Sequence, residues 1–155
     1  MKFETREQNG CRSIKLWYDF CIVPHQSVRA TRTGHFYAPS KISDFKNLVI
    51  LDTMRQIRKQ KPLIGPILFS ADYAFPILKS MPNKIKELIL SGKLFYKTSK
   101  PDITDNTQKA FIDAVSEALD FKDQEISEVG PIRKFYSNKP YIIATFTELP
   151  NPWGL

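Results

Sequence analysis

The chain has 155 residues, of which 42% are apolar and 25% charged, and its net charge is +7. These values are typical of one globular domain with a single core and exclude a fibrous or wholly disordered protein, while a basic balance favours a polyanionic partner such as nucleic acid. Two cysteines are too few for a disulfide framework, and no apolar run approaches the roughly 20 residues of a membrane span.

The first part of the chain predicts a strand, a short basic hairpin and a long helix. Residues 1–12 are polar, and we expect them to be loose. Residues 13–23 are rich in aromatic and β-branched side chains, which predicts a strand. Basic residues surround a glycine over residues 28–37, which predicts a short hairpin or an ordered loop. Over residues 40–60 the apolar side chains fall on one side of a helix, and serines near residue 40 can cap it.

The second part of the chain predicts further strands and helices. The clearest helix is expected over residues 105–119, because its apolar residues form one stripe at helical spacing. Residues 137–139 are expected to form a hairpin turn between the last two strands. The other predictions are a strand over 66–75, a short helix over 83–90, strands over 125–136 and 140–148, and an irregular tail over 150–155. This order predicts a single α+β domain over residues 13–149, with helices packed on a mixed sheet.

The acidic residues are concentrated in one segment. Residues 102–128 hold 8 of the 16 acidic residues and only two basic ones, so the rest of the chain carries 21 basic and 8 acidic residues. Such a segment is either a solvated surface or a cation site within a surface that holds a polyanion. On the expected helix, Asp105, Lys109 and Asp113 lie nearly opposite the apolar stripe. Ion pairs worth about 0.3–0.5 kcal/mol each would also explain this spacing, and Asp105 can serve as a helix N-cap.

The acidic segment carries a combination of short motifs. Residues 100–109 read KPDITDNTQK, Asp113-Ala114 follows, and residues 121–126 read FKDQEI. The combination resembles the RusA family of Holliday junction resolvases, whose pattern is a basic residue, an Asp pair followed by Asn, a Lys four residues after the second Asp, an Asp-Ala-Leu stretch and an Asp-Asp-x-Gln element. The Lys-rich segment 79–100 is similar to an insertion in phage-type members. The resemblance covers about residues 18–148 and implies a RusA-like α+β fold and a homodimer.

Two positions depart from the family pattern. Asp102 and Asp105 are separated by two residues where the family usually has one, which leaves open whether one or both hold a metal ion. Lys122 stands where the family commonly has the first Asp of its later pair, so that Asp123 matches the second, the family's catalytic residue. Lys109 matches the family's lysine at the expected spacing.

The resemblance implies a set of site residues. Asp102, Asp105 and Asp123 would hold Mg²⁺ (or Mn²⁺), an ion that binds hard oxygen ligands and can activate water. These three residues and Lys109 would be catalytic, with Lys109 near the scissile phosphate or the developing charge. Asn106 and Asp113 would have supporting roles, and Asp113 is more readily explained as structural. The expected contacts to the DNA backbone are Arg29, Arg32, Lys97, Lys100, Arg133 and Lys134, each of which is equally explained as a solvated residue.

The resemblance implies a magnesium-dependent endonuclease that makes paired nicks in four-way DNA during recombination and repair. We expect a cytoplasmic protein, of bacterial and prophage or phage origin, without an organic cofactor or a membrane partner. Two alternatives remain open: a branched-DNA-binding protein of the same fold that does not cut, and a nuclease of broader specificity that also cuts flaps or forks.

Overall fold

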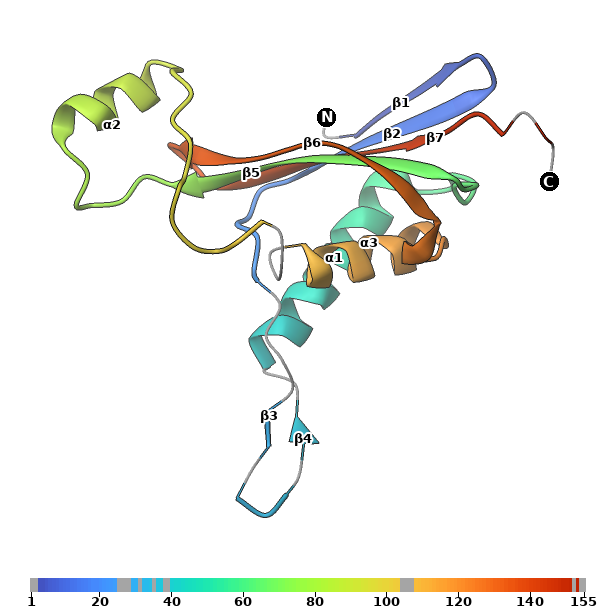
Figure 1. Ribbon diagram of the computed structural model, residues 1–155, viewed down its shortest axis with the longest axis horizontal. Coiled ribbons are helices and arrows are strands. Elements are labelled where there is room, and N and C mark those ends of the chain that lie inside the picture. The colour runs from blue at the N-terminus through green and yellow to red at the C-terminus, as the bar shows by residue number, and fades with distance from the viewer. Residues whose placement is uncertain are drawn as a thin grey trace.

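The protein has an α+β fold in which two helices pack against one face of a five-stranded mixed sheet (Figure 1). The computed structural model describes residues 3–24, 29–30, 32–34, 36–37, 40–103, 108–151 and 153. In chain order the elements are β1 (Phe3–Gln8), β2 (Cys11–Tyr18), β3 (Arg29–Ala30), β4 (Phe36–Tyr37), α1 (Ser40–Ile57), β5 (Ile67–Pro76), α2 (Asn83–Leu90), α3 (Lys109–Leu119), the 3₁₀ turn η1 (Asp123–Glu125), β6 (Ile126–Ser137) and β7 (Tyr141–Glu148).

The N-terminal segment is ordered rather than loose. Residues 3–8 form β1, which pairs with β2 in an antiparallel hairpin. Asn9 and Gly10 make the two-residue turn with φ values of 54° and 75°. A type I′ turn needs a positive φ at both central positions, and Asn-Gly is the pair that adopts it most readily. The prediction of a loose segment over 1–12 is therefore wrong for the residues from Phe3 onward.

The sheet order corrects the hairpin that was predicted at residues 137–139. The strands lie in the order β1-β2-β7-β5-β6, with β5 parallel to β6 and antiparallel to β7. The last two strands therefore do not pair, because β5 lies between them. Crossing one intervening strand spans about 10 Å, a distance that three extended residues can cover. A three-residue connection is thus compatible with a crossover as well as with a hairpin.

The core lies between the sheet and the helices α1 and α3. Ile14, Leu16 and Tyr18 of β2 alternate toward this core and are fully buried. The apolar stripe predicted for α3 is also buried, and the Phe111 ring packs edge-on against Tyr18 and Tyr73 at centroid distances of 5.3 and 6.2 Å. Truncating a buried phenylalanine of this kind typically costs about 3–5 kcal/mol, so Phe111→Ala would remove a large part of the domain's stability.

The predicted helices agree with the structure, with one shift at each long helix. The short helix at 83–90 has the predicted bounds. The first helix ends at Ile57 rather than at residue 60, because Arg58 takes a positive φ of 49°. The predicted helix over 105–119 begins at Lys109 in the structure, and residues 104–107 are outside the described part of the chain. Across the described residues, no helix is long and apolar enough to cross a bilayer.

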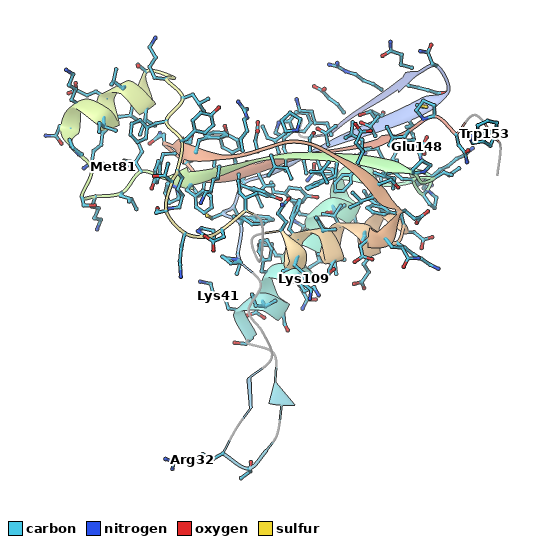
Figure 2. The ribbon with its side chains drawn as sticks, in the orientation of Figure 1. Arg32, Lys41, Met81, Lys109, Glu148 and Trp153 are labelled. Carbon is cyan, nitrogen blue, oxygen red and sulfur yellow. The ribbon has the colours of Figure 1, made fainter. Side chains whose placement is uncertain are left out.

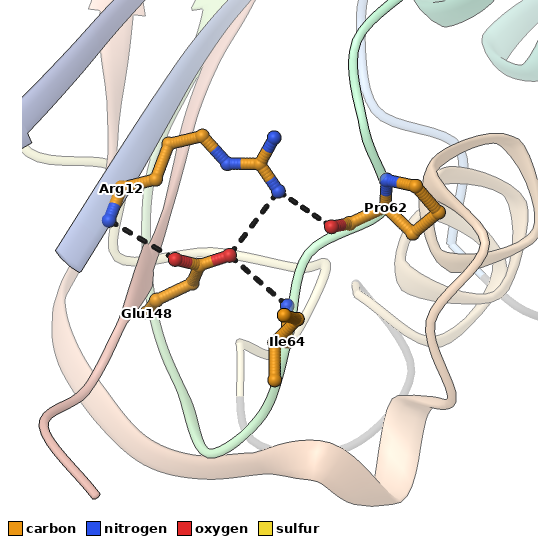
Figure 3. Close-up of polar contacts among 4 residues, drawn as sticks. All are labelled: Arg12, Pro62, Ile64 and Glu148. Atoms are coloured by element: carbon orange, nitrogen blue, oxygen red, sulfur yellow. Dashed lines mark hydrogen bonds and ion pairs between the residues drawn. The ribbon is translucent and has the colours of Figure 1, made fainter. Parts of the chain in front are cut away.

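A carboxylate network joins three distant segments at one end of the sheet (Figure 3). Glu148, at the end of β7, accepts hydrogen bonds from the backbone N–H groups of Arg12 and Ile64, each at 3.1 Å. The Arg12 guanidinium donates to Glu148 at 3.1 Å and to the carbonyl oxygen of Pro62. This network anchors the loop between α1 and β5 to the start of β2 and the end of β7.

Candidate active site at the entrance of α3

Asp102 lies on the loop that leads into α3, and its side chain is exposed. Lys109, also exposed, is the first residue of that helix (Figure 2). Asp105 and Asn106 lie outside the described residues, which end at 103 before this segment and resume at 108. Asp102 and Lys109, the described catalytic candidates of segment 100–109, therefore belong to one loop and the helix that it enters.

The loop reaches this position along the edge of β6. Tyr96 forms an isolated antiparallel bridge with Phe135. The N–H of Lys97 donates to the carbonyl of Lys134 at 3.0 Å, and the N–H of Tyr136 donates to the carbonyl of Phe95 at 3.0 Å. These backbone bonds fix where the chain leaves the sheet and turns toward α3.

Lys134 and Lys97 hold the next residues of the loop. The Lys134 ammonium donates to the carbonyl oxygens of Ser99 and Pro101, the latter at 2.7 Å. The Lys97 ammonium donates to the hydroxyl of Ser99 at 2.9 Å and to the phenol of Tyr136 at 3.3 Å. An ammonium has three N–H donors, so each lysine already uses two of them within the protein. Both were predicted to contact DNA, and the structure gives them internal partners.

A second set of bonds fixes the loop from the helix side. Gln108 donates through Nε2 to the carbonyl of Ile103 at 3.2 Å, and its Oε1 accepts from the hydroxyl of Tyr73 at 3.2 Å. Tyr73 is fully buried, and burial raises the pKa of its phenol, which therefore stays protonated as a donor. Asp102 thus lies between two residues whose carbonyl groups are both held in place.

The surroundings of this loop are electropositive. Burial by itself would raise the pKa of Tyr136, but the hydrogen bonds with Ser99 and Lys97 and the charges of Lys97 and Lys134 outweigh it, so the pKa is lowered. Lys100 adds a further exposed positive charge next to Asp102. The exposed ammonium of Lys100 would attract an approaching phosphate backbone, whereas those of Lys97 and Lys134 are already bonded within the protein.

Asp123 lies at the other end of α3. Phe121 donates its N–H to the carbonyl of Ser116 at 3.1 Å, which ties this segment to the C-terminal turn of α3, and η1 follows at once (Figure 1). An 11-residue helix is about 16 Å long, so Asp102 before α3 and Asp123 after it are separated by a distance of this order.

The register of β6 gives the same result independently. Lys134, which contacts Pro101, is eight residues along the strand from Ile126, a distance of about 26 Å, whereas Asp123 comes just before Ile126. Oxygen ligands of Mg²⁺ lie at about 2.1 Å from the ion, so the expected meeting of Asp102 and Asp123 at one ion does not occur within one subunit. Among the residues that the structure describes, no three His, Cys, Asp or Glu side chains are grouped so as to hold a metal.

The remaining predicted residues lie away from this loop. Asp113 forms an ion pair with Lys46 at 3.5 Å, which links α3 to α1 and is a structural contact. Arg133 lies on the opposite face of the sheet from Lys134, since neighbouring residues of a strand alternate faces. There it makes two hydrogen bonds to Asp72, at 2.6 and 2.7 Å, and these bonds raise the pKa of its guanidinium.

The two predicted arginines of the N-terminal half belong to the small β3–β4 hairpin. Arg29 is in β3, and Arg32 is exposed in the turn at the tip of the hairpin (Figure 2). Figure 2 shows Arg32 at the far end of this hairpin, well away from Lys109. A DNA contact by Arg32 would therefore be remote from the entrance of α3.

The described donor set is compatible with magnesium and unsuited to a structural zinc site. Mg²⁺ is usually bound by one or two carboxylates and keeps several waters, whereas structural zinc needs four nitrogen or sulfur ligands. Asp102 supplies one exposed carboxylate, and the sequence places Asp105 three residues later. The loop therefore fits a site with few protein ligands.

Comparison with known proteins identifies a family. A family model described as endodeoxyribonuclease RusA matches residues 20–145, from the end of the β1–β2 hairpin into β7. The matched region includes the loop of Asp102, the whole of α3 and η1. No curated protein matches the chain.

Proposed function

Because the chain belongs to the RusA endodeoxyribonuclease family, we propose that it is a magnesium-dependent nuclease that resolves Holliday junctions by paired nicks. The observation that carries this proposal is the position of Asp102. Asp102 is exposed on a braced loop that leads into α3, between Lys100 and Lys109 in the chain and within the region that the family model matches.

We propose that Asp102 and Asp105 hold the divalent cation, Mg²⁺ or in its place Mn²⁺. When bound, such an ion activates water and stabilises charge on a phosphoryl group. Lys109 would bind the scissile phosphate, because it is exposed at the first residue of α3, directly after Gln108, which holds the Asp102 loop. Asn106 would orient one of the carboxylates. Lys100 would contact the neighbouring backbone, since an exposed lysine beside the loop can reach an incoming phosphate.

The sequence predicted that Asp123 binds the same metal ion as Asp102, and the structure requires another role for it. A helix length separates it from Asp102, so within one subunit it cannot ligate the same ion. We propose a homodimer because a four-way junction has approximate two-fold symmetry and needs two matched cuts. A part for Asp123 in cutting would then require contact with DNA at a second position or across the subunit interface.

A labelled four-way junction and a linear duplex of the same arms, each incubated with and without Mg²⁺, test the proposal. We expect symmetric nicks in the junction alone, only with metal, and none after Asp102→Asn. Cutting of flaps as readily as junctions would replace the proposal with a broader nuclease.

The separation of Asp102 and Asp123 favours one other function, binding of branched DNA without cutting. Tight junction binding with no product in Mg²⁺ or Mn²⁺ would establish it in place of the nuclease. The same binding assay in Ca²⁺ separates the two, because a nuclease would bind there and cut once Mg²⁺ is added.

A further inference from the structure

We propose that Lys134 and the pair Gln108–Tyr73 are positioning residues that form a two-sided clamp on the backbone around Asp102. Lys134 fixes the residue before Asp102, and Gln108 fixes the residue after it. The inference rests on the proposed function only where it treats Asp102 as a metal ligand. The hydrogen bonds that form the clamp do not depend on that function.

The first side of the clamp comes from the sheet. Lys134 belongs to β6, whose backbone is paired with β5 from Ile67 to Pro76, so its Cα is held by the sheet. From there its ammonium reaches the carbonyl groups of Ser99 and Pro101. Two charge-assisted bonds to one short loop fix its path more firmly than a contact with a single atom would.

The second side comes from the core and the helix entrance. Tyr73 is buried in β5 and donates to Gln108, which in turn donates to the carbonyl of Ile103. Gln108 is the residue before α3 and makes no capping bond with its side chain. Its amide is thus used to connect the loop with the sheet rather than to cap the helix.

The two sides meet at Asp102 and leave its side chain exposed. The carbonyls of Pro101 and Ile103 are both held, while Asp102 between them faces solvent. A ligand on a fixed backbone loses little freedom when it binds an ion, so ligand orientation by such neighbours raises metal affinity. The clamp therefore lowers the Mg²⁺ concentration that the protein needs.

This assignment differs from a DNA contact by Lys134. A lysine that binds a phosphate contributes to DNA affinity and to its salt dependence, and removing it weakens binding with or without metal. A lysine that holds the Asp102 loop contributes to the metal requirement and leaves DNA affinity unchanged. The two roles predict opposite readouts for the same substitution.

Hydrogen exchange of the metal-free full chain tests the clamp directly. The N–H of Lys97, bonded to the carbonyl of Lys134, is the protected amide at the start of this loop, and we expect exchange in peptides covering residues 97–103 to be about 3- to 10-fold faster in Lys134→Met and in Tyr73→Phe, the range that corresponds to loss of one net hydrogen bond. Tyr73→Phe keeps the buried ring, so the core packing is retained. Lys139→Met and Tyr141→Phe are the matched controls, because Lys139 is an exposed turn lysine and Tyr141 lies on the other face of the sheet.

A magnesium titration of junction cutting then connects the clamp to function. Both clamp variants should need about 3- to 10-fold more Mg²⁺ for half-maximal cutting, with junction affinity in Ca²⁺ unchanged, and Lys134→Arg should restore most of the wild-type requirement. Unchanged exchange over 97–103 in both variants would overturn the clamp. Weaker junction binding by Lys134→Met without a shift in the magnesium requirement would overturn it as well. If the wild-type protein cuts no DNA, the proposed function fails, and the exchange data still decide the clamp.

Discussion

Replacing Glu148 with alanine should destabilise the protein far more than removing an exposed acid. Glu148 is 14% exposed and accepts three hydrogen bonds, two from Arg12 and one from the N–H of Ile64 (Figure 3). The alanine variant leaves these donors without their acceptor. An unsatisfied buried donor costs about 1–3 kcal/mol, and water can reach part of this site, so we expect a total loss of about 2–4 kcal/mol.

Two further variants calibrate this expectation. Glu148→Gln keeps a carbonyl acceptor but loses the charge, and it should cost about 1 kcal/mol. Glu4 forms an ion pair with Arg6 at 3.5 Å, but their side chains are 49% and 81% exposed, so Glu4→Ala should change stability by less than about 0.5 kcal/mol.

Urea unfolding followed by circular dichroism measures all three variants. The midpoint should fall in the order Glu4→Ala, Glu148→Gln, Glu148→Ala, from least to most, at an unchanged slope. A Glu148→Ala variant as stable as Glu4→Ala would refute the view that this network anchors the loop between α1 and β5.

The remaining predictions concern the lysine of α3 and the buried hydroxyl chain of the core. Lys109→Ala should lower the rate of junction cutting more than it lowers junction binding, and equal losses in both would remove Lys109 from the chemistry. Tyr18 and Thr53 share a buried bond of 2.7 Å, and the Thr53 hydroxyl also donates to the carbonyl of Val49. Thr53→Val should cost about 1–3 kcal/mol because it leaves the buried Tyr18 hydroxyl unpaired, whereas Tyr18→Phe should cost about 1 kcal/mol; urea unfolding giving the reverse order would contradict this reasoning.

Local sequence patterns predicted most of the elements but not how distant strands pair. The helix at 83–90 and the buried stripe of α3 follow from spacing that can be seen within one segment. The hairpin predicted at 137–139 was wrong because a short turn-like sequence is compatible with both a hairpin and a crossover, and only the position of β5 decides between them. Asn9-Gly10 carried a strong hairpin signal, but the polar strand before it gave no apolar alternation to support it.

The candidate site was predicted in part. The motif predicted Asp102 or Asp105 at a helix start with Lys109 one turn further along, whereas in the structure Lys109 is the first residue of α3 and Asp102 lies on the loop before it. It did not reveal that Asp123 is a helix length away from Asp102, although the 13 residues between Lys109 and Asp123 already imply a long separation if most are helical. Strand alternation also indicates that Arg133 and Lys134 cannot serve the same surface.

The contacts of Tyr73 and Gln108 were missed for a different reason. Tyr73 and Gln108 are 35 residues apart in the chain, and they meet because β5 packs against the start of α3. No local pattern in the sequence indicates such a contact.

Cleavage of a supercoiled plasmid that extrudes a cruciform tests the central claim most directly. Paired nicks across the junction convert the plasmid to a linear product in a single binding event, whereas unpaired nicking gives only open circles. We predict linear product in Mg²⁺ that disappears with Asp102→Asn and with chelation of the metal. Open circles alone, or no product in either Mg²⁺ or Mn²⁺, would contradict the assignment of this protein as a junction-resolving nuclease.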